Sequence, residues 1–206
     1  AAARFDCQGC GQTGGSLSKT TLSGRVEEIR AVRDYLLADS RLTGPVLFLG
    51  SSFGGTAALL LAAREPGGAG VVAWSTPSDF SVLEKRRASI EEQPLDQTFF
   101  DDVRAIDLLK EVQGLSPCLI VHGQDDQTVP LEQAYRLAQA LGQPSRLVVI
   151  NGADHALTTS GAVDLALAET MAWLENLSLT SGRQLGGDAG QVPVSPADPA
   201  AQEKAG

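Results

Sequence analysis

The residues best suited to chemistry lie in the stretch Gly50-Ser51-Ser52-Phe53-Gly54-Gly55, a G-x-S-x-G pattern centred on Ser52. An apolar run that predicts a buried strand precedes it, and an apolar run that predicts a buried helix follows it. In a strand-to-helix turn of this kind the serine takes a strained conformation with positive φ and exposes its hydroxyl as a nucleophile. We expect side chains at positions 50 and 54 to collide with neighbouring backbone. The N–H of Phe53, at the helix start, is the candidate donor to a developing oxyanion.

A serine nucleophile needs a general base, and the chain contains two histidines, His122 and His155. Each follows or ends an apolar run that predicts a strand, and open α/β sheets place their sites at the carboxyl ends of strands. In hydrolases with this serine turn the chain order is serine, then acid, then histidine. His155 leaves room for an acid between itself and Ser52. We therefore predict His155 as the base and His122 as a packing residue at a strand end.

The third member of such a site is a carboxylate that accepts a hydrogen bond from the histidine and fixes its tautomer. It is expected after the third apolar run, where the sequence contains two adjacent candidates, Asp125 and Asp126. Residue types and spacing do not choose between these neighbours.

The elements that must position these residues are short apolar runs alternating with helical patterns. The runs at residues 45–49, 71–74, 118–121 and 147–150 are continuously hydrophobic, as in strands buried on both faces of a parallel sheet. Residues 56–63 are apolar almost all round, which predicts a buried helix. Spacings of three and four residues predict further helices through Val26, Ile29, Val32 and Leu36; Val103, Ile106, Leu109 and Val112; Leu131, Ala134, Ala138 and Leu141; and Leu167, Met171 and Leu174. This alternation predicts an α/β fold with a mostly parallel sheet and helices on both faces.

The motifs and their order resemble those of the α/β-hydrolases, over residues 4–177. That family often has G-x-x-D-x-x-V-P after the strand in question, and Gly123, Asp126, Val129 and Pro130 match it. The resemblance thus implies that Asp126 is the acid and Asp125 a solvated neighbour. The family's final motif is similar to Gly152-Ala153-Asp154-His155, which implies His155 as the base and Asp154 as a turn residue. The stretch from Phe100-Asp101-Asp102-Val103 to the predicted strand at Cys118 looks similar to small bacterial esterases of the cinnamoyl-esterase and serine-aminopeptidase-like group.

The first residues also resemble a family motif, D-x-R-G-x-G-x-S, although Gln8 replaces its arginine and Thr13 its serine. The pair Cys7 and Cys10 has C-x-x-C spacing, but no helix opens there and zinc needs four ligands, so we expect neither a redox nor a metal site. In the family three strands precede this motif, and a loop after the third supplies one oxyanion donor. The resemblance therefore implies an N-terminally truncated hydrolase that lacks one donor loop.

Composition excludes several classes of function. Hydrophobic residues make up 43% of the 206 residues and charged residues 20%, as in a globular domain. No apolar run approaches the roughly 18 to 20 residues that cross a bilayer. A formal net charge of −9 disfavours nucleic-acid and anionic membrane partners. Three cysteines cannot make a disulfide framework, which favours a cytoplasmic location.

The predicted domain organisation is an α/β-hydrolase domain at residues 1–177 followed by a tail. A mixed, charged segment at about residues 79–101 predicts a short cap over the carboxyl edge of the sheet. Residues 178–206 lack aromatics and are rich in glycine and proline, which predicts a disordered tail.

Together these features predict a serine hydrolase that cleaves a carboxylic ester, thioester or small amide through an acyl-enzyme. The expected catalytic residues are Ser52, Asp126 and His155, with the Phe53 N–H in the oxyanion hole and with no metal or organic cofactor. The expected partner is a small-molecule ester or amide. Two alternatives remain open: a non-catalytic binding or interaction protein of the same fold, and a C–C bond hydrolase or haloperoxidase-like enzyme with the same three residues.

Overall fold

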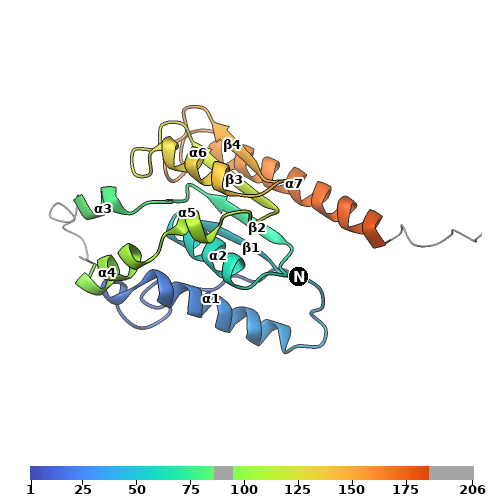
Figure 1. Cartoon of the computed structure of the whole chain (residues 1–206), viewed down its shortest axis with the longest axis horizontal. Coiled ribbons are helices and arrows are strands. Elements are labelled where there is room, and N and C mark those ends of the chain that lie inside the picture. The colour runs from blue at the N-terminus through green and yellow to red at the C-terminus, as the bar shows by residue number, and fades with distance from the viewer. Residues whose placement is uncertain (86–94, 186–206) are drawn as a thin grey trace, which may run out of the picture. The chain divides into compact units, whose positions relative to one another are not determined.

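A single parallel sheet organises the chain. The computed structural model describes residues 1–85 and 95–185, and its four strands lie in the order β1-β2-β3-β4, all parallel (Figure 1). The strands are β1 (Leu47–Ser51), β2 (Gly70–Trp74), β3 (Cys118–Gly123) and β4 (Arg146–Ile150). Strand order follows chain order, so each helical crossover carries the chain to the next strand and all carboxyl ends share one edge. The prediction of four parallel strands is confirmed. Burial on both faces holds for the central strands β2 and β3 but not for the edge strands, because β1 has no buried residue and β4 has only Ile150.

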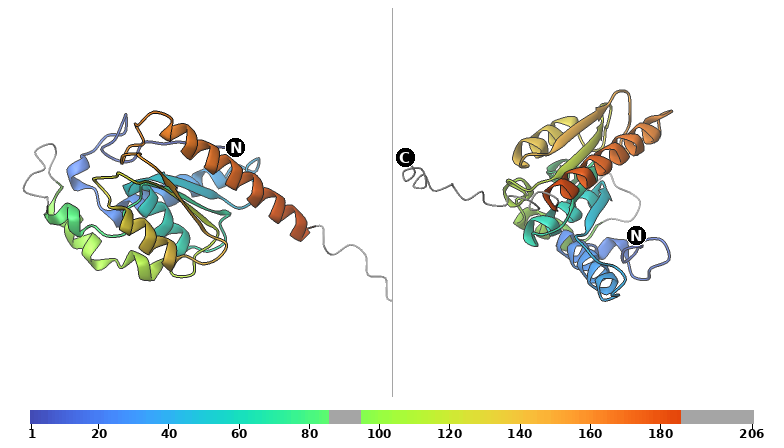
Figure 2. Two further views of the ribbon diagram at one scale, coloured as in Figure 1. Left: turned by 90° about the horizontal axis from the view of Figure 1, so that it is seen from above. Right: turned by 90° about the vertical axis from the view of Figure 1, so that its right-hand side faces the viewer.

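Helices connect the strands and cover the sheet. They are the 3₁₀ turn η1 (Leu17–Lys19), α1 (Leu22–Leu37), α2 (Phe53–Arg64), α3 (Ser81–Lys85), α4 (Gln97–Ala105), α5 (Leu108–Glu111), α6 (Leu131–Ala140) and α7 (Ala162–Leu185). Figure 2 shows α2 and α6 on one face of the sheet and the start of α7 on the other. On that second face the indole N–H of Trp74 donates to Thr170 Oγ1 at 3.1 Å. The predicted α/β fold with helices on both faces is therefore confirmed.

The core lies between the sheet and its first layer of helices. α2 begins next to the sheet edge and is buried from Gly55 to Ala62, as its uniformly apolar sequence predicts. Every residue of β3 is buried, which is the pattern of a central parallel strand covered on both faces. Leu22 and Val26 of α1 pack into the same hydrophobic cluster. α1 starts where it does because Thr21 Oγ1 accepts the Gly24 N–H at 3.0 Å as an N-cap.

One helix prediction is wrong. The apolar residues from Val103 to Val112 have the spacing of a single helix, but the structure divides them between α4 and α5. Ile106 has an extended backbone, with φ −111° and ψ 114°, and so ends α4. Asp107 then caps α5 by accepting the Lys110 N–H at 3.2 Å. The side chains keep their apolar face although the helix is broken, because Val103, Ile106 and Leu109 still pack on the core.

The cap and tail predictions fall partly outside the described residues. Within the predicted cap at residues 79–101 the structure has α3 and the start of α4, while residues 86–94 lie outside the described part of the chain. The chain divides into two compact units, Ala1–Thr170 and Met171–Gly206. α7 continues to Leu185, so the boundary predicted after residue 177 falls inside a helix. The first proline of the tail is Pro193, so no ring forces the helix to end earlier. The rest of the predicted tail, residues 186–206, is not among the described residues.

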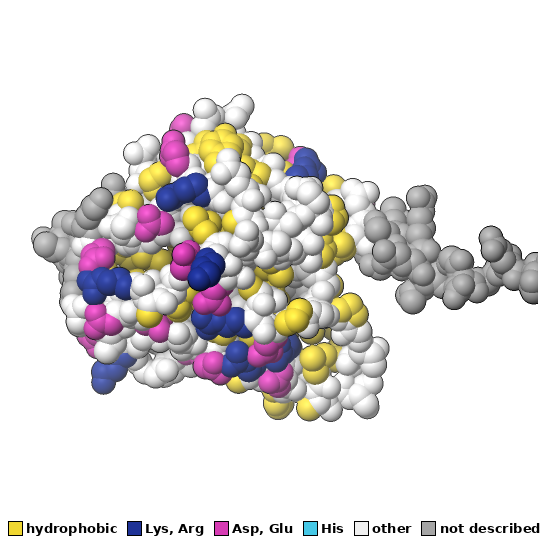
Figure 3. Space-filling model, viewed as in Figure 1, with side chains coloured by type: hydrophobic (Ala, Val, Ile, Leu, Met, Phe, Trp, Pro, Cys, Tyr) yellow, Lys and Arg dark blue, Asp and Glu magenta, His cyan; other side chains and the backbone are white. Residues whose placement is uncertain are grey.

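Acidic and basic side chains are interspersed on the face shown in Figure 3. Glu65 at the end of α2 pairs with both Arg30 and Arg33 of α1, and Arg64 forms a two-pronged pair with Glu111 at 2.7 and 2.8 Å. These pairs tie α1 and α5 to the end of α2 rather than forming a surface of one charge. Among the described residues no helix has the length and hydropathy needed to cross a bilayer.

The core described above predicts which leucines matter for stability. Leu60 in α2 is fully buried, so Leu60→Ala should lower the free energy of unfolding by about 2–5 kcal/mol. Leu165 in α7 is 56% exposed, and Leu165→Ala should change the free energy of unfolding by less than about 0.5 kcal/mol. Urea denaturation of both variants measures the difference. Equal losses would contradict the assignment of α2 to the centre of the core.

Candidate active site

Ser52 is the one residue between the end of β1 and the start of α2, and it forms a sharp turn. Its backbone has φ 51° and ψ −125°, a region that costs a non-glycine residue of order 1–3 kcal/mol. The turn is held because the Ser52 N–H donates to the Trp74 carbonyl of β2 at 2.7 Å, while Gly55 N donates to the Ser52 carbonyl at 3.0 Å. The positive φ expected from the sequence is therefore present, and the serine lies at the carboxyl end of the strand.

The glycines around Ser52 differ in what they permit. A Cβ at Gly50 would lie 2.4 Å from the Gly54 carbonyl oxygen, so position 50 has no room for a side chain. A Cβ at Gly55 would lie 2.0 Å from Thr76 Oγ1, which agrees with close packing of α2 against the sheet. At Gly54, however, a Cβ would meet nothing within 4 Å. The expectation of a collision at position 54 is thus wrong, because this residue faces outward from the first turn of α2.

The loop after β3 turns one of its two adjacent aspartates inward. Asp126 is buried, and its Oδ1 accepts the N–H groups of Thr128 and Val129, both at 2.8 Å. Asp125 is exposed to solvent. Two backbone donors on one carboxylate oxygen fix the side chain and stabilise its negative charge. The other oxygen, Oδ2, is left to bind a side chain from elsewhere.

His155 comes from the loop after β4 and bridges Asp126 and Ser52. Its Nδ1 lies 2.8 Å from Asp126 Oδ2, and its Nε2 lies 3.0 Å from Ser52 Oγ. The two loops can meet because Gly123 ends β3 without a side chain, where a Cβ would lie 2.4 Å from the Ala153 carbonyl oxygen. The Asp125 N–H also donates to that carbonyl at 3.0 Å. The structure therefore brings Ser52, His155 and Asp126 into one hydrogen-bonded chain.

This chain of hydrogen bonds has a definite direction. An ionised carboxylate only accepts, so the imidazole proton lies on Nδ1 of His155 and points to Asp126. Nε2 is then the acceptor, and the Ser52 hydroxyl donates to it. An arrangement of this kind can take the hydroxyl proton as the oxygen attacks an electrophile. Phe53, the first residue of α2, presents its N–H at the start of the helix, where such groups have no acceptor within the helix.

Two other predicted side chains have the local roles assigned to them. Asp154 accepts the Thr158 N–H at 2.7 Å and also binds the Thr158 hydroxyl, which together stabilise the turn around His155. These hydrogen bonds from Thr158 lower the pKa of the Asp154 carboxyl. His122 is buried at the end of β3, as expected of a packing residue.

His122 also has a contact that its position in the sequence did not reveal. Its Nε2 donates to the Val129 carbonyl at 2.9 Å and lies 3.4 Å from Asp126 Oδ2. Within the described part of the chain its Nδ1 has no hydrogen-bond partner. Burial lowers the pKa of the imidazole, and the hydrogen bond to the Val129 carbonyl and the Asp126 carboxylate oppose this decrease only in part. His122 thus supports the Asp126 loop as a neutral donor. The sequence signal for this contact was the position of His122 at the end of a predicted strand, four residues before Asp126.

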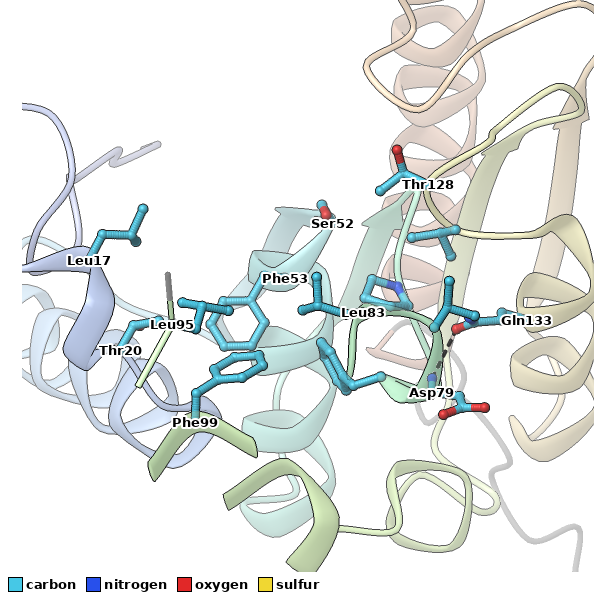
Figure 4. A pocket seen from close by; sticks show the side chains of 14 residues that line it. Leu17, Thr20, Ser52, Phe53, Asp79, Leu83, Leu95, Phe99, Thr128 and Gln133 are labelled. Atoms are coloured by element: carbon cyan, nitrogen blue, oxygen red, sulfur yellow. Dashed lines mark hydrogen bonds between the residues drawn. The ribbon is translucent and has the colours of Figure 1, made fainter. Parts of the chain in front are cut away.

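A pocket of about 280 Å³ opens beside Ser52 (Figure 4). Its lining is mostly apolar and is formed by Leu17, Thr20, Ser52, Phe53, Pro77, Asp79, Phe80, Val82, Leu83, Leu95, Phe99, Thr128, Val129 and Gln133. Three of the phenylalanines pack on one another, with Phe53 and Phe80 edge to face at a centroid distance of 5.9 Å and Phe53 and Phe99 at 5.5 Å. The serine hydroxyl therefore lies at the boundary between a polar sheet edge and an aromatic cavity.

The far wall of the pocket is held by Gln133 of α6. Its side-chain oxygen accepts the N–H groups of Ser78 and Asp79, both at 2.9 Å, and the second of these bonds is drawn in Figure 4. Asp79 in turn accepts from the N–H and hydroxyl of Ser81 at the start of α3. These bonds fix the loop after β2 against α6. No cluster of three or more potential metal ligands occurs among the described residues.

Comparison with known proteins places this geometry in a family. The sequence pattern of the prolyl oligopeptidase family matches residues 16–180, more than half of the chain. The chain belongs to the prolyl oligopeptidase family. It is therefore a member of a family of hydrolases with the α/β-hydrolase fold, and the resemblance inferred from its motifs is confirmed at this level.

Curated relatives match only in part. A non-heme haloperoxidase from Rhodococcus erythropolis is 37% identical over 78 residues, which cover 38% of this chain and 25% of that protein. An uncharacterized protein of Mycobacterium tuberculosis is 29% identical over 153 residues, covering 73% of this chain and 51% of that protein. The chain thus spans between a quarter and about half of the length of the curated relatives it matches.

Solved structures of esterases share the fold. The esterase domain of a Rhodothermus marinus protein superposes with a TM-score of 0.62 at 26% identity, covering 76% of this chain and 69% of that one. Est1E from Butyrivibrio proteoclasticus, solved with ferulic acid, superposes with a TM-score of 0.69 at 23% identity, covering 84% and 76%. The second likeness establishes the α/β-hydrolase fold alone.

The glycines of the Ser52 turn give a matched pair of variants. Gly50→Ala should lower the free energy of unfolding by about 1–3 kcal/mol or more, because its Cβ would press on backbone that cannot move without opening the turn. Gly54→Ala should leave the free energy of unfolding within about 0.5 kcal/mol of wild type, or raise it, because the position is open and helical. Thermal and urea unfolding compare the two. A larger loss in Gly54→Ala than in Gly50→Ala would contradict this geometry.

The buried imidazole of His122 predicts a pH dependence of stability. Its pKa is lowered in the folded chain, while the unfolded chain binds a proton near the usual value of about 6.5. As the pH falls from about 7 to 5 the unfolded state gains more protons, so this residue reduces the free energy of unfolding. His122→Gln keeps a donor for Val129 but does not titrate. We expect the variant to lose less stability than wild type between these pH values in urea unfolding, and an identical loss would contradict the assignment.

Proposed function

We propose that the chain is a serine hydrolase that cleaves a carboxylic ester, thioester or small amide with Ser52, His155 and Asp126. The observation that carries this proposal is the continuous hydrogen-bonded chain from Asp126 Oδ2 through the His155 ring to Ser52 Oγ, at 2.8 and 3.0 Å. Membership of the prolyl oligopeptidase family supports the same class of reaction. The positive φ of Ser52, which presents its hydroxyl at the sheet edge, supports a role as nucleophile.

In the first half of the reaction Ser52 Oγ attacks the carbonyl carbon of the substrate while His155 Nε2 takes the hydroxyl proton. The carbonyl oxygen becomes negatively charged, and the N–H of Phe53 contributes one hydrogen bond to it. His155 then returns the proton to the leaving alcohol, thiol or amine, and an acyl-enzyme on Ser52 remains. In the second half a water molecule loses a proton to Nε2, attacks the acyl carbon and releases the acid.

Asp126 supports this cycle without exchanging a proton itself. Its carboxylate holds the Nδ1–H of His155 and stabilises the positive charge that the ring acquires twice per turnover. The two backbone N–H donors on its Oδ1 keep the charge in place in a buried position. The Nε2–H of His122 faces the same carboxylate from β3 and supports the loop that carries it.

The pocket favours a substrate with an apolar group next to the scissile bond. Its aromatic wall of Phe53, Phe80 and Phe99 is suited to an aryl or branched alkyl group, and its volume of about 280 Å³ fits a small molecule rather than a folded protein. Est1E, with the same fold, was solved with ferulic acid. We therefore propose aryl and short-chain alkyl esters as the first substrates to test.

Covalent labelling tests the nucleophile. A fluorophosphonate probe should label the protein once, at Ser52, because the phosphonyl group reacts with an activated serine and mimics the acylated state. Ser52→Ala should abolish labelling, while Ser51→Ala, which changes the neighbouring hydroxyl, should retain it. Peptide mapping by mass spectrometry locates the adduct. A folded wild-type protein that is not labelled would instead support a non-catalytic binding protein of this fold.

The two adjacent aspartates test the acid. Asp126→Asn should lower kcat for an aryl ester by about 10⁴-fold, because the amide cannot hold the same imidazole tautomer. Asp125→Asn should leave kcat within about twofold, since that side chain is exposed and outside the hydrogen-bonded chain. Circular dichroism confirms that both variants fold. A comparable loss of activity in both would contradict the assignment of Asp126.

A further inference from the structure

Two cysteines that the proposed function does not use lie at the ends of one tight turn. The Cys10 N–H donates to the Cys7 carbonyl at 2.9 Å, which closes a four-residue β-turn, and Gly9 in its third position has φ +75°. A turn of this kind keeps its first and fourth Cα atoms within about 7 Å. Disulfides need Cα atoms roughly 4.4–6.8 Å apart, so the backbone of this turn meets the main geometric requirement for a bridge.

The side chain of Arg25 in α1 lies against this turn. Its guanidinium donates to Cys10 Sγ at 3.4 Å and to the Gln8 carbonyl at 3.1 Å, and it interacts electrostatically with Cys7 as well as Cys10. Arg25 is only 5% exposed and is itself held by Glu28 at 2.9 Å. One fixed cation therefore faces both thiols, which are free and half-buried.

The loop that carries the turn is folded on itself. Gly9 N donates to the Gly14 carbonyl and Thr13 N to the Cys10 carbonyl, both at 3.0 Å, while Asp6 accepts the Gln12 N–H at 3.1 Å. These bonds hold the Cys7–Cys10 turn in one conformation before any bridge forms. With two thiols and no cluster of three or more potential metal ligands among the described residues, the site suits sulfur–sulfur chemistry better than metal binding.

We propose, contrary to the expectation from the sequence that this pair has no redox role, that Cys7 and Cys10 form a reversible intrachain disulfide, with a small-molecule disulfide such as glutathione disulfide as the oxidant. One cysteine sulfur attacks a sulfur of the oxidant, forms a mixed disulfide and releases one thiol; the other cysteine then attacks the mixed disulfide and releases the second thiol. Two cysteine S–H bonds are lost, one S–S bond forms in the protein, and the oxidant is reduced to two thiols. We assign the first attack to Cys10, whose sulfur accepts the charged donor, and the second to Cys7.

The surroundings of Cys7 bear on the second attack. Burial raises the pKa of its thiol, the Glu28 carboxylate raises it further, and Arg25 opposes this increase. The thiolate is the reactive form, so exchange at Cys7 should become faster as the pH rises. The remaining cysteine behaves differently, because burial in β3 raises the pKa of Cys118 to about 11 and keeps it from the solvent. Cys118 is therefore an internal control.

The turn also backs one wall of the pocket. A Cβ at Gly9 would lie 2.4 Å from the Leu17 nitrogen, so the Cys7–Cys10 turn is pressed against the backbone that carries Leu17. Leu17 lines the pocket beside Ser52. A bridge between the cysteines would fix the turn that supports this wall.

The proposal is tested by equilibrating the full chain with stepwise ratios of reduced to oxidised glutathione, followed by acid quenching, alkylation and mass spectrometry. We expect a species that lacks two hydrogen atoms and two alkylation sites, with the bridge inside the single tryptic peptide of residues 5–19. Excess reduced glutathione should reverse it. Cys118→Ser should behave as wild type, while Cys7→Ser and Cys10→Ser should each form at most a mixed disulfide. Glu28→Gln should speed bridge formation at neutral pH.

The same titration in urea shows whether the folded structure favours the bridge, or whether the bridge forms only because the two cysteines are close in sequence. We expect the equilibrium constant for the bridge to be at least about tenfold larger in the folded chain than in the unfolded chain, because the turn is formed in advance. Glutathione adducts on Cys7 and Cys10 without a bridge would overturn the proposal. An equilibrium constant that is equal or smaller in the folded chain would overturn it as well. Neither readout depends on hydrolytic activity, so the result is independent of the proposed function.

Discussion

The hydrogen bond between the Asp126 carboxylate and the Nδ1–H of His155 is the interaction on which the rest of the site depends. It joins two loops that follow neighbouring parallel strands, β3 and β4, and it aims Nε2 of His155 at Ser52 at 3.0 Å. Other features of the fold position both partners of this hydrogen bond. Backbone N–H groups hold Asp126 Oδ1, and the absence of a side chain at Gly123 lets the second loop approach.

The parallel sheet explains why these side chains meet although 103 residues separate Ser52 from His155. All four strands run the same way, so their carboxyl ends lie at one edge, and every candidate residue follows the end of a strand. The strained backbone of Ser52 persists because α2, which follows it, is buried almost throughout and is anchored by Thr56 Oγ1 donating to the Pro77 carbonyl at 2.8 Å. Packing thus holds a local conformation that the serine alone would not adopt.

Much of this arrangement could be predicted from the sequence, because it depends on short-range patterns. Continuous apolar runs identify the parallel strands, and a serine between glycines after such a run identifies the turn at Ser52. The choice of Asp126 over Asp125 needed a family resemblance, since neighbouring residues of one type differ only in which of them the loop turns toward backbone donors. The structure buries Asp126 and exposes Asp125.

What the sequence could not reveal depends on three-dimensional contacts. The free space at Gly54 and the crowding at Gly50 follow from the direction of α2, which a motif does not encode. The apolar residues of α4 and α5 keep the spacing of one continuous helix, so periodicity alone predicts a single helix. The break between them is visible only in the structure, where Asp107 caps α5. Two contacts join residues that no recognisable spacing in the sequence connects. His122 approaches Asp126, and Arg25 contacts the Cys7–Cys10 turn.

In the proposed site Asp126 fixes the neutral imidazole of His155 with its proton on Nδ1, which leaves Nε2 to accept the hydrogen bond from the Ser52 hydroxyl. Nitrogen-15 NMR of histidine-labelled protein measures the position of this proton directly. The chain has two histidines, so in the His122→Gln variant every imidazole signal belongs to His155. We expect a protonated Nδ1 and an unprotonated Nε2 in the neutral ring, and loss of this preference in Asp126→Asn. A proton on Nε2 in the wild-type chain, or a tautomer that Asp126→Asn does not change, would contradict this assignment.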